Sequence, residues 1–95
     1  MPHLIGIEGL AAGTAFALTT PVVTIGHDAE SDIALMDRAV LRHQARLLID
    51  KSGQVHVEAG DSASTILVND TRVARAVLAP GDLLQIGDSV FRFEA

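Results

Sequence analysis

Apolar and polar residues alternate along much of this chain, in short runs interrupted by Gly, Asp and Ser. The clearest example is a segment in which Val55, Val57 and Ala59 alternate with polar residues, as in a half-buried strand. Residues 45–49 follow the same period of two. The polar segment 50–53 between these runs ends in Gly, which suits a turn residue with positive φ. The pattern therefore predicts a hairpin over residues 45–59.

Similar short runs predict further strands at 4–8, 14–18, 22–25, 32–35, 66–68, 83–86 and 89–93. In the last of these, the period of two places Phe91 and Phe93 on the inward face. Residues 72–78 have no clear period and fit either a strand or an extended loop. Residues 36–39 allow one helical turn at most. Many short strands separated by turn residues, without a convincing helix, predict an all-β sandwich.

Composition narrows the class of protein. A chain of 95 residues forms one domain, over residues 1–95. The absence of Cys removes disulfides, thiolate zinc sites and thiol nucleophiles. A net charge of −5 argues against binding to nucleic acid or to an anionic membrane surface. No apolar run approaches the ~20 residues of a membrane span, and residues 1–3 have no basic charge typical of a signal peptide. We therefore expect a cytoplasmic domain without membrane insertion.

A resemblance to a known family lies between Thr24 and Arg46. This stretch contains Ile25-Gly26-His27, Asp32-Ile33-Ala34-Leu35 and Leu41-Arg42-His43-Gln44-Ala45. It resembles the forkhead-associated (FHA) domain, whose pattern there is Ile-Gly-Arg, Asn/Asp-Asp-Ile-x-Leu and Ser-Arg-x-His-Ala. Residues 68–73 and 80–88 extend the resemblance over nearly the whole chain.

The resemblance implies a specific architecture and function. The fold would be a two-sheet antiparallel β-sandwich of FHA type, with about 10–11 short strands. The loops after Ile25, before Gln44 and before Ile66 would lie together at one end of the sandwich. In the FHA family these loops bind phosphothreonine peptides.

At the positions that would contact phosphate, this chain departs from the family. His27 replaces an arginine, and histidine is mostly neutral at pH 7. If Gln44 takes the place of the family's bracing histidine, the phosphate-binding serine becomes Leu41. If His43 takes that place instead, the serine becomes Val40, so either register lacks the hydroxyl. Arg42 retains a basic charge, which could donate hydrogen bonds to an anion, stay solvated or pair with a nearby acid.

The third loop departs from the family too. The family's Ser-Ser-Asn-Gly-Thr corresponds here to residues 62–66. The asparagine that would hold the ligand backbone becomes Ser64, and the next two positions are Thr65 and Ile66. Asn69 then matches the family again. The residues predicted to contact a partner or a residual anion are His27, Leu41, Arg42, Ser64, Thr65, Ile66 and Asn69.

Other kinds of site find little support. Asp28, Asp32 and Asp37 fall at turn positions, so we expect no metal site there, and no cofactor is expected. Ser64 and Thr65 have no nucleophile elbow or oxyanion loop around them, so no enzymatic activity is expected.

Three functions remain open. The favoured interpretation is a non-enzymatic protein-interaction module that does not depend on phosphothreonine, with Leu41 as an apolar contact in a pocket bounded by Ile66. The second is a weakened phosphothreonine-peptide binder that uses Arg42, His27 and the hydroxyls of residues 64 and 65. The third is a structural domain of a larger assembly. The expected partner is a protein or peptide, in a homodimer or in a secretion or regulatory assembly.

Overall fold

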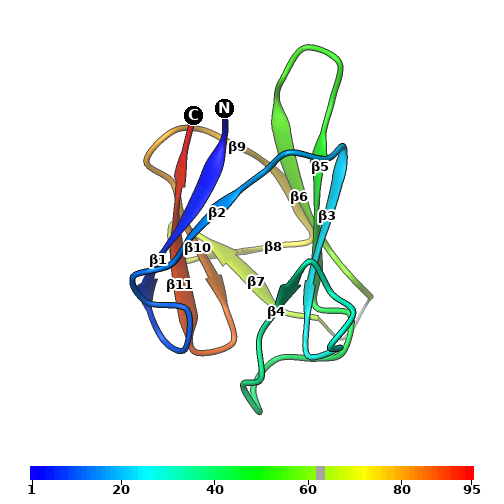
Figure 1. The fold of residues 1–95 in the computed structure, drawn as a ribbon, viewed down its shortest axis with the longest axis vertical. Coiled ribbons are helices and arrows are strands. Elements are labelled where there is room, and N and C mark those ends of the chain that lie inside the picture. The colour runs from blue at the N-terminus through cyan, green and yellow to red at the C-terminus, as the bar shows by residue number, and fades with distance from the viewer. Residues whose placement is uncertain (62–63) are drawn as a thin grey trace.

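The structure is a computed structural model that describes residues 1–61 and 64–95. Within these ranges, two β-sheets pack face to face (Figure 1). The first sheet has the strand order β2 (Ala15–Ala17), β1 (His3–Glu8), β11 (Ser89–Glu94), β10 (Leu83–Ile86), β7 (Ile66–Val68), β8 (Thr71–Val73). The second has the order β4 (Ile33–Ala34), β3 (Val22–Gly26), β5 (Ala45–Ile49), β6 (Val55–Ala59), β9 (Arg75–Leu78). No helix occurs within these ranges, and therefore none that could cross a membrane.

Most strands pair as the sequence predicts. The β5–β6 hairpin places Leu47 opposite Val57, and Gly53 in its turn has a φ of 89°. The β10–β11 hairpin places Leu84 opposite Phe91. All strand pairs but one are antiparallel among the described residues; β3 and β4 run parallel, with Ile25 opposite Ile33. The predicted antiparallel sandwich therefore contains one parallel pair, at the edge of the second sheet.

The parallel pair has a local cause. Both the backbone N–H and the hydroxyl of Thr24 donate to the Asp32 carboxylate, at 2.9 and 3.1 Å. The backbone N–H of Asp32 in turn donates to the Thr24 hydroxyl at 3.0 Å. These bonds bring the chain back beside β3, so that β4 starts again in the direction of β3.

Residues 72–78 also differ from a single strand or loop. The segment divides at Ala74 into the end of β8, which pairs with β7, and β9, which pairs with β6. The chain thus passes from one sheet to the other, which explains why no single period runs through it.

The core lies between the sheets. Phe91 and Phe93 point inward as predicted, with exposures of 0% and 4%. Phe91 meets Phe16 edge to face, with ring centroids 6.0 Å apart. Together with side chains such as Leu4, Leu47 and Leu84, they hold the two sheets together by burial of apolar surface. The loops between the strands extend from this packed core. Both termini lie at the opposite end of the molecule from the loops around β4 (Figure 1).

Candidate functional site

The loops after β3 and before β5 meet at Gly26. A Cβ atom built on Gly26 would lie 2.0 Å from the carbonyl oxygen of Arg42, so no larger residue fits without a backbone shift. The backbone N–H of His27 donates to the carbonyl oxygen of Leu41 at 2.9 Å. The loops after Ile25 and before Gln44 therefore lie together, as predicted. We call the part of the molecule formed by these two loops and by the loop before β7 the loop end.

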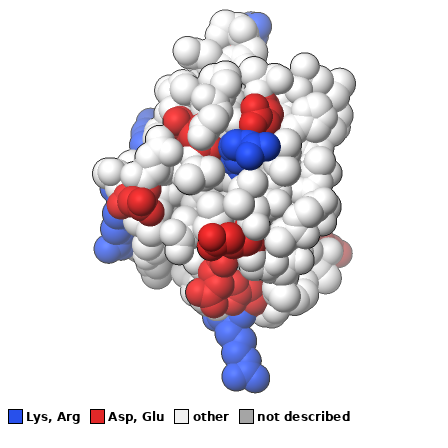
Figure 2. All heavy atoms as spheres, turned by 90° about the vertical axis from the view of Figure 1, so that its left-hand side faces the viewer, with Lys and Arg blue, Asp and Glu red and all other residues white. Residues whose placement is uncertain are grey.

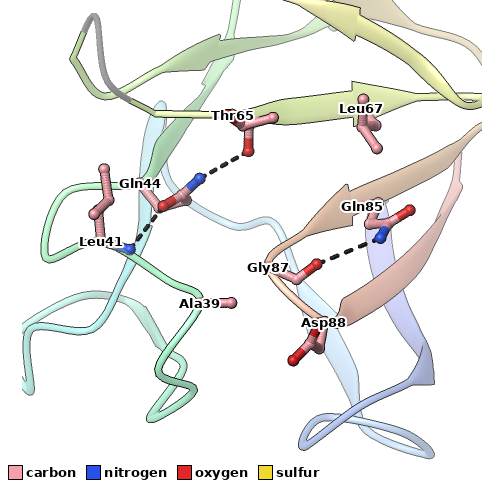
Figure 3. Close-up of a pocket in the computed structure, with 8 residues that line it drawn as sticks. All are labelled: Ala39, Leu41, Gln44, Thr65, Leu67, Gln85, Gly87 and Asp88. Atoms are coloured by element: carbon pink, nitrogen blue, oxygen red, sulfur yellow. Dashed lines mark hydrogen bonds between the residues drawn. The ribbon is translucent and has the colours of Figure 1, made fainter.

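Gln44 joins the loop before β5 to the loop before β7 (Figure 3). Its Oε1 accepts the backbone N–H of Leu41 at 2.7 Å, and its Nε2 donates to the carbonyl oxygen of Thr65 at 2.8 Å. The side chain is only 2% exposed. This is the bracing role that the resemblance gives to a histidine, and the neighbouring His43 is exposed instead. The geometry therefore favours the register that places Leu41 on the phosphate-binding serine.

Leu41 points outward from this braced loop. Its backbone N–H and carbonyl are both bonded, to Gln44 and His27, while its side chain leaves the residue 40% exposed. The preceding Val40 is 4% exposed and belongs to the core. Leu41 borders two surface hollows, which lie on either side of it.

The first hollow, which we call the loop hollow, has a volume of about 530 Å³. Its lining residues are His27, Asp28, Ala29, Arg38, Val40, Leu41 and Arg42. The ring Nδ1 of His27 lies 3.0 Å from the carbonyl oxygen of Asp37. The Nε of Arg42 donates to the Asp28 carboxylate at 3.1 Å. The backbone N–H of Glu30 and the Arg42 guanidinium both lower the pKa of Asp28. Of the roles considered for Arg42, the structure shows an ion pair with a nearby acid, Asp28.

Arg38 is a charged residue of the loop hollow to which the sequence analysis gave no role. It is exposed and comes from the polar segment between β4 and β5. The family pattern gives that segment no role, so its charge was the only signal available.

The second hollow beside Leu41, which we call the side hollow, has a volume of about 360 Å³. Its lining residues are Ala39, Leu41, Gln44, Thr65, Leu67, Gln85, Gly87 and Asp88 (Figure 3). One wall is the loop before β5; the other consists of β7 with its preceding loop and the turn between β10 and β11. The Asp37 carboxylate accepts the backbone N–H of Asp88 at 3.0 Å, which fixes the turn against the loop. Gln85, Gly87 and Asp88 were not among the predicted site residues.

The third loop differs from expectation. Ser64 is 5% exposed; its hydroxyl donates to the carbonyl oxygen of His43 at 3.3 Å, and its N–H donates to the Asp61 carboxylate at 3.1 Å. Ile66 is 0% exposed, so it cannot border a surface pocket. Thr65 is exposed and Leu67 is half-buried, and these two residues take that place. Ser62 and Ala63 lie outside the described residues.

Asn69 lies away from the other predicted site residues, after the far end of β7. Its Nδ2 donates to the Asp82 carboxylate and its Oδ1 accepts the backbone N–H of Leu83, both at 3.0 Å. Asn69 and Asp70 have φ angles of 51° and 68°, as a tight hairpin turn requires. Asn69 therefore fixes a turn instead of contributing to the loop end.

The carboxylates of Asp28, Asp32 and Asp37 each accept a backbone N–H from a nearby residue, from Glu30, Thr24 and Ala39. In the part of the chain that the structure describes, no group of three His, Asp or Glu side chains is placed to hold a metal ion. On the face shown in Figure 2, most of the surface carries no charged side chain, and separate groups of acidic side chains lie in both its upper and lower halves.

Over residues 6–95, the sequence matches the family described as the cytoplasmic domain of an inner membrane component of the type III secretion system (T3SS). The chain belongs to this family. It is also similar to the glycogen accumulation regulator GarA of Mycolicibacterium smegmatis, with 37% identity over 86% of this chain and 60% of that protein. The chain thus spans less than two thirds of that relative's length.

Two solved structures show the same fold. The FHA domain of FhaA, complexed with the intracellular domain of Rv3910, has a TM-score of 0.87 at 22% identity, over 99% of this chain and 100% of that one. The cytoplasmic domain of the T3SS sorting platform protein PscD from P. aeruginosa has a TM-score of 0.80 at 21% identity, over 97% of this chain and 78% of that one. The predicted FHA-type β-sandwich is confirmed.

Proposed function

We propose that this FHA domain is a non-enzymatic, cytoplasmic protein-interaction module whose loop end binds an unphosphorylated protein segment. The observation that carries the proposal is Leu41. It is 40% exposed on a loop held by Gln44, at the position where the resembling family presents a hydroxyl to phosphate. An isobutyl group there gives an apolar contact and cannot donate a hydrogen bond to an anion.

The polar groups around Leu41 support this choice. Charge-assisted hydrogen bonds to phosphate need free donors held at the site. The Nε of Arg42 is engaged by Asp28, which leaves its terminal nitrogens as the donors open to an anion, and the Ser64 hydroxyl is turned inward. The loop hollow still contains His27 and Arg38, so weak anion binding is the second candidate function.

The relatives suggest the setting. The family is described as part of a secretion-system component, and the FhaA domain was solved with a protein partner. We propose that this domain docks into a larger cytoplasmic assembly in the same general way. A homodimer through Leu41 is the alternative arrangement.

The test uses two matched peptide libraries, one with phosphothreonine and one with threonine. The chain is immobilised through a terminal tag, because both termini lie at the opposite end from the loop end (Figure 1). We expect the retained sequences not to depend on phosphate, and Leu41→Ser to reduce retention severalfold without changing the melting temperature. Leu83→Ser is the matched control, since Leu83 is 44% exposed on β10.

Retention that requires phosphate would refute the proposal. A fall of several degrees in the melting temperature of Leu41→Ser would refute it too, because Leu41 would then be a packing residue. Sedimentation equilibrium of the wild type and Leu41→Ser decides whether the occupant is a second copy of this chain.

A further inference from the structure

The side hollow, defined above by its eight lining residues, combines aliphatic and neutral polar side chains with a single charge. Leu41 and Leu67 come from its two sides, and Asp88 is the only lining residue with a formal charge among the described residues (Figure 3). The hollow of about 360 Å³ is large enough for one long side chain. The hollow therefore offers a ligand two leucine side chains and one anionic group.

The polar groups of the hollow differ in whether they are already bonded. Gln44 uses its Oε1 and its Nε2 to join the two loops. Within the described residues, nothing donates to the Asp88 carboxylate, although the backbone N–H of Asp88 is held by Asp37. Thr65 is exposed on the same wall as Asp88 and adds a hydroxyl. Gln85 donates its Nε2 to the carbonyl oxygen of Gly87 at 3.4 Å, and nothing in the described residues donates to its Oε1. Asp88, Gln85 and Thr65 thus offer a ligand side-chain acceptor oxygens.

We propose that the side hollow binds an arginine side chain of the partner segment, an inference that rests on the proposed function and names its partner's chemistry. The aliphatic stem of arginine covers apolar surface while its charged end reaches polar groups. Its guanidinium has five N–H donors in a planar fork, which suits the Asp88 carboxylate together with a further acceptor oxygen of the same hollow. The net charge of −5 favours approach of a cationic segment.

The loop hollow makes this placement selective. It contains Arg38 and Arg42, and only Asp28 opposes them among its described lining residues. A guanidinium is therefore attracted to the side of Leu41 that carries Asp88 and repelled from the other side. Leu41 separates the two environments, so the partner segment has a defined orientation.

The experiment is an NMR titration of the uniformly ¹⁵N-labelled chain with N-acetyl-arginine N-methylamide. We expect saturable shifts of the backbone amides of Thr65, Leu67 and Asp88 and of the side-chain amide of Gln85. Asp88→Asn should weaken binding about two- to fivefold, the range of an exposed ion pair. Asp70→Asn is the matched control: it removes the same charge from an exposed turn after the far end of β7.

Two further probes isolate the contributions of the arginine. N-acetyl-norleucine N-methylamide retains an aliphatic stem without the charge, and N-acetyl-glutamate N-methylamide reverses the charge. Both should shift the side-hollow amides less than the arginine probe at equal concentration. The inference is overturned if norleucine binds as well as arginine, if Asp70→Asn and Asp88→Asn have equal effects, or if the arginine shifts fall on the loop hollow.

This result is separable from the proposed function. If the phosphate-free library is retained through Leu41 but Asp88→Asn changes nothing, only the arginine assignment fails. If retention requires phosphate, the proposed function fails whatever the arginine probe does.

Discussion

Gln44 shows how one buried side chain can hold a binding surface in place. It satisfies the backbone N–H of Leu41 and the carbonyl oxygen of Thr65, which belong to different loops. Neither group has a strand partner to bond instead. The position of the exposed Leu41 side chain therefore depends on an amide that never reaches the surface itself.

Replacing Gln44 by Leu should remove both bonds at nearly constant volume. Leaving a buried polar group unpaired costs about 1–3 kcal/mol. In a domain of this size, each kcal/mol corresponds to a fall of about 4–8 °C in melting temperature. We therefore expect the melting temperature of Gln44→Leu to lie at least about 4–8 °C below that of the wild type in a thermal melt followed by circular dichroism.

Gln44→His should recover most of the loss, because a neutral imidazole has one donor and one acceptor. His43→Ala is the control, since His43 is the exposed neighbour. A Gln44→Leu variant as stable as the wild type would show that the two loops hold their positions without this bridge.

At this scale the sequence predicted some side-chain positions and missed others. The family pattern favoured an accessible Leu41 but left an inward-folded loop open, and Leu41 is 40% exposed in the structure. Ile66 was a candidate contact whose exposure the sequence left open; it begins β7 and shares the inward face with Val68 by the period of two, so the alternation favoured the core. The inward turn of Ser64 depends on Asp61 and on the carbonyl of His43, a contact across the fold that no local pattern reports.

At the scale of elements, the β5–β6 hairpin was the best predicted because its signals agree. Alternating apolar residues, a polar turn and a glycine all indicate the same structure. The division of residues 72–78 into β8 and β9 was not predictable. It depends on two pairings, with β7 and with β6, that lie in different sheets.

The hairpin turn should make the domain sensitive to acid. The Asp50 carboxylate accepts hydrogen bonds from Ser52, from His56 and from the backbone of Gln54, which lower the pKa of Asp50 from its ordinary value of 3.8. The folded state therefore binds this proton less tightly than the unfolded state. Its contribution to stability is present above pH 3.8 and is lost as the pH falls further.

Urea unfolding of the wild type and Asp50→Asn should show this directly. We expect the difference in unfolding free energy between the two to be larger at pH 6 than at pH 3, because the wild type loses the contribution of the carboxylate in acid. Asp70→Asn serves as the control for removing an exposed charge in a turn. A difference that does not change with pH would mean that the carboxylate acts only through the shape of the turn.

At the scale of the whole molecule, the loop end and the two termini lie at opposite ends of the β-sandwich (Figure 1). An immobilised chain therefore presents Leu41 to solution. The fold is of FHA type, and our proposal is that the groups that bind phosphate in the resembling family are replaced here at His27 and Leu41. Restoring two of them tests whether the rest of the site still works.

The double variant His27→Arg with Leu41→Ser should bind phosphothreonine peptides at least about tenfold more tightly than the wild type. The first change supplies a permanent charge, and the second supplies a hydroxyl on a loop that is already braced. Ser64 is left alone because it is buried and holds the third loop. Calorimetry with matched phosphorylated and unphosphorylated peptides measures the gain.

The control for this variant is His56→Arg with Leu83→Ser, which makes the same chemical changes away from the loop end. His56 lies on β6 beside Asp50, and Leu83 begins β10. Equal gains in both double variants would reveal a general charge effect, since each adds one positive charge to an acidic domain. A gain confined to the loop-end variant would show that the geometry for reading phosphate persists. In that case Leu41 and His27, and not the fold, set the specificity of this domain.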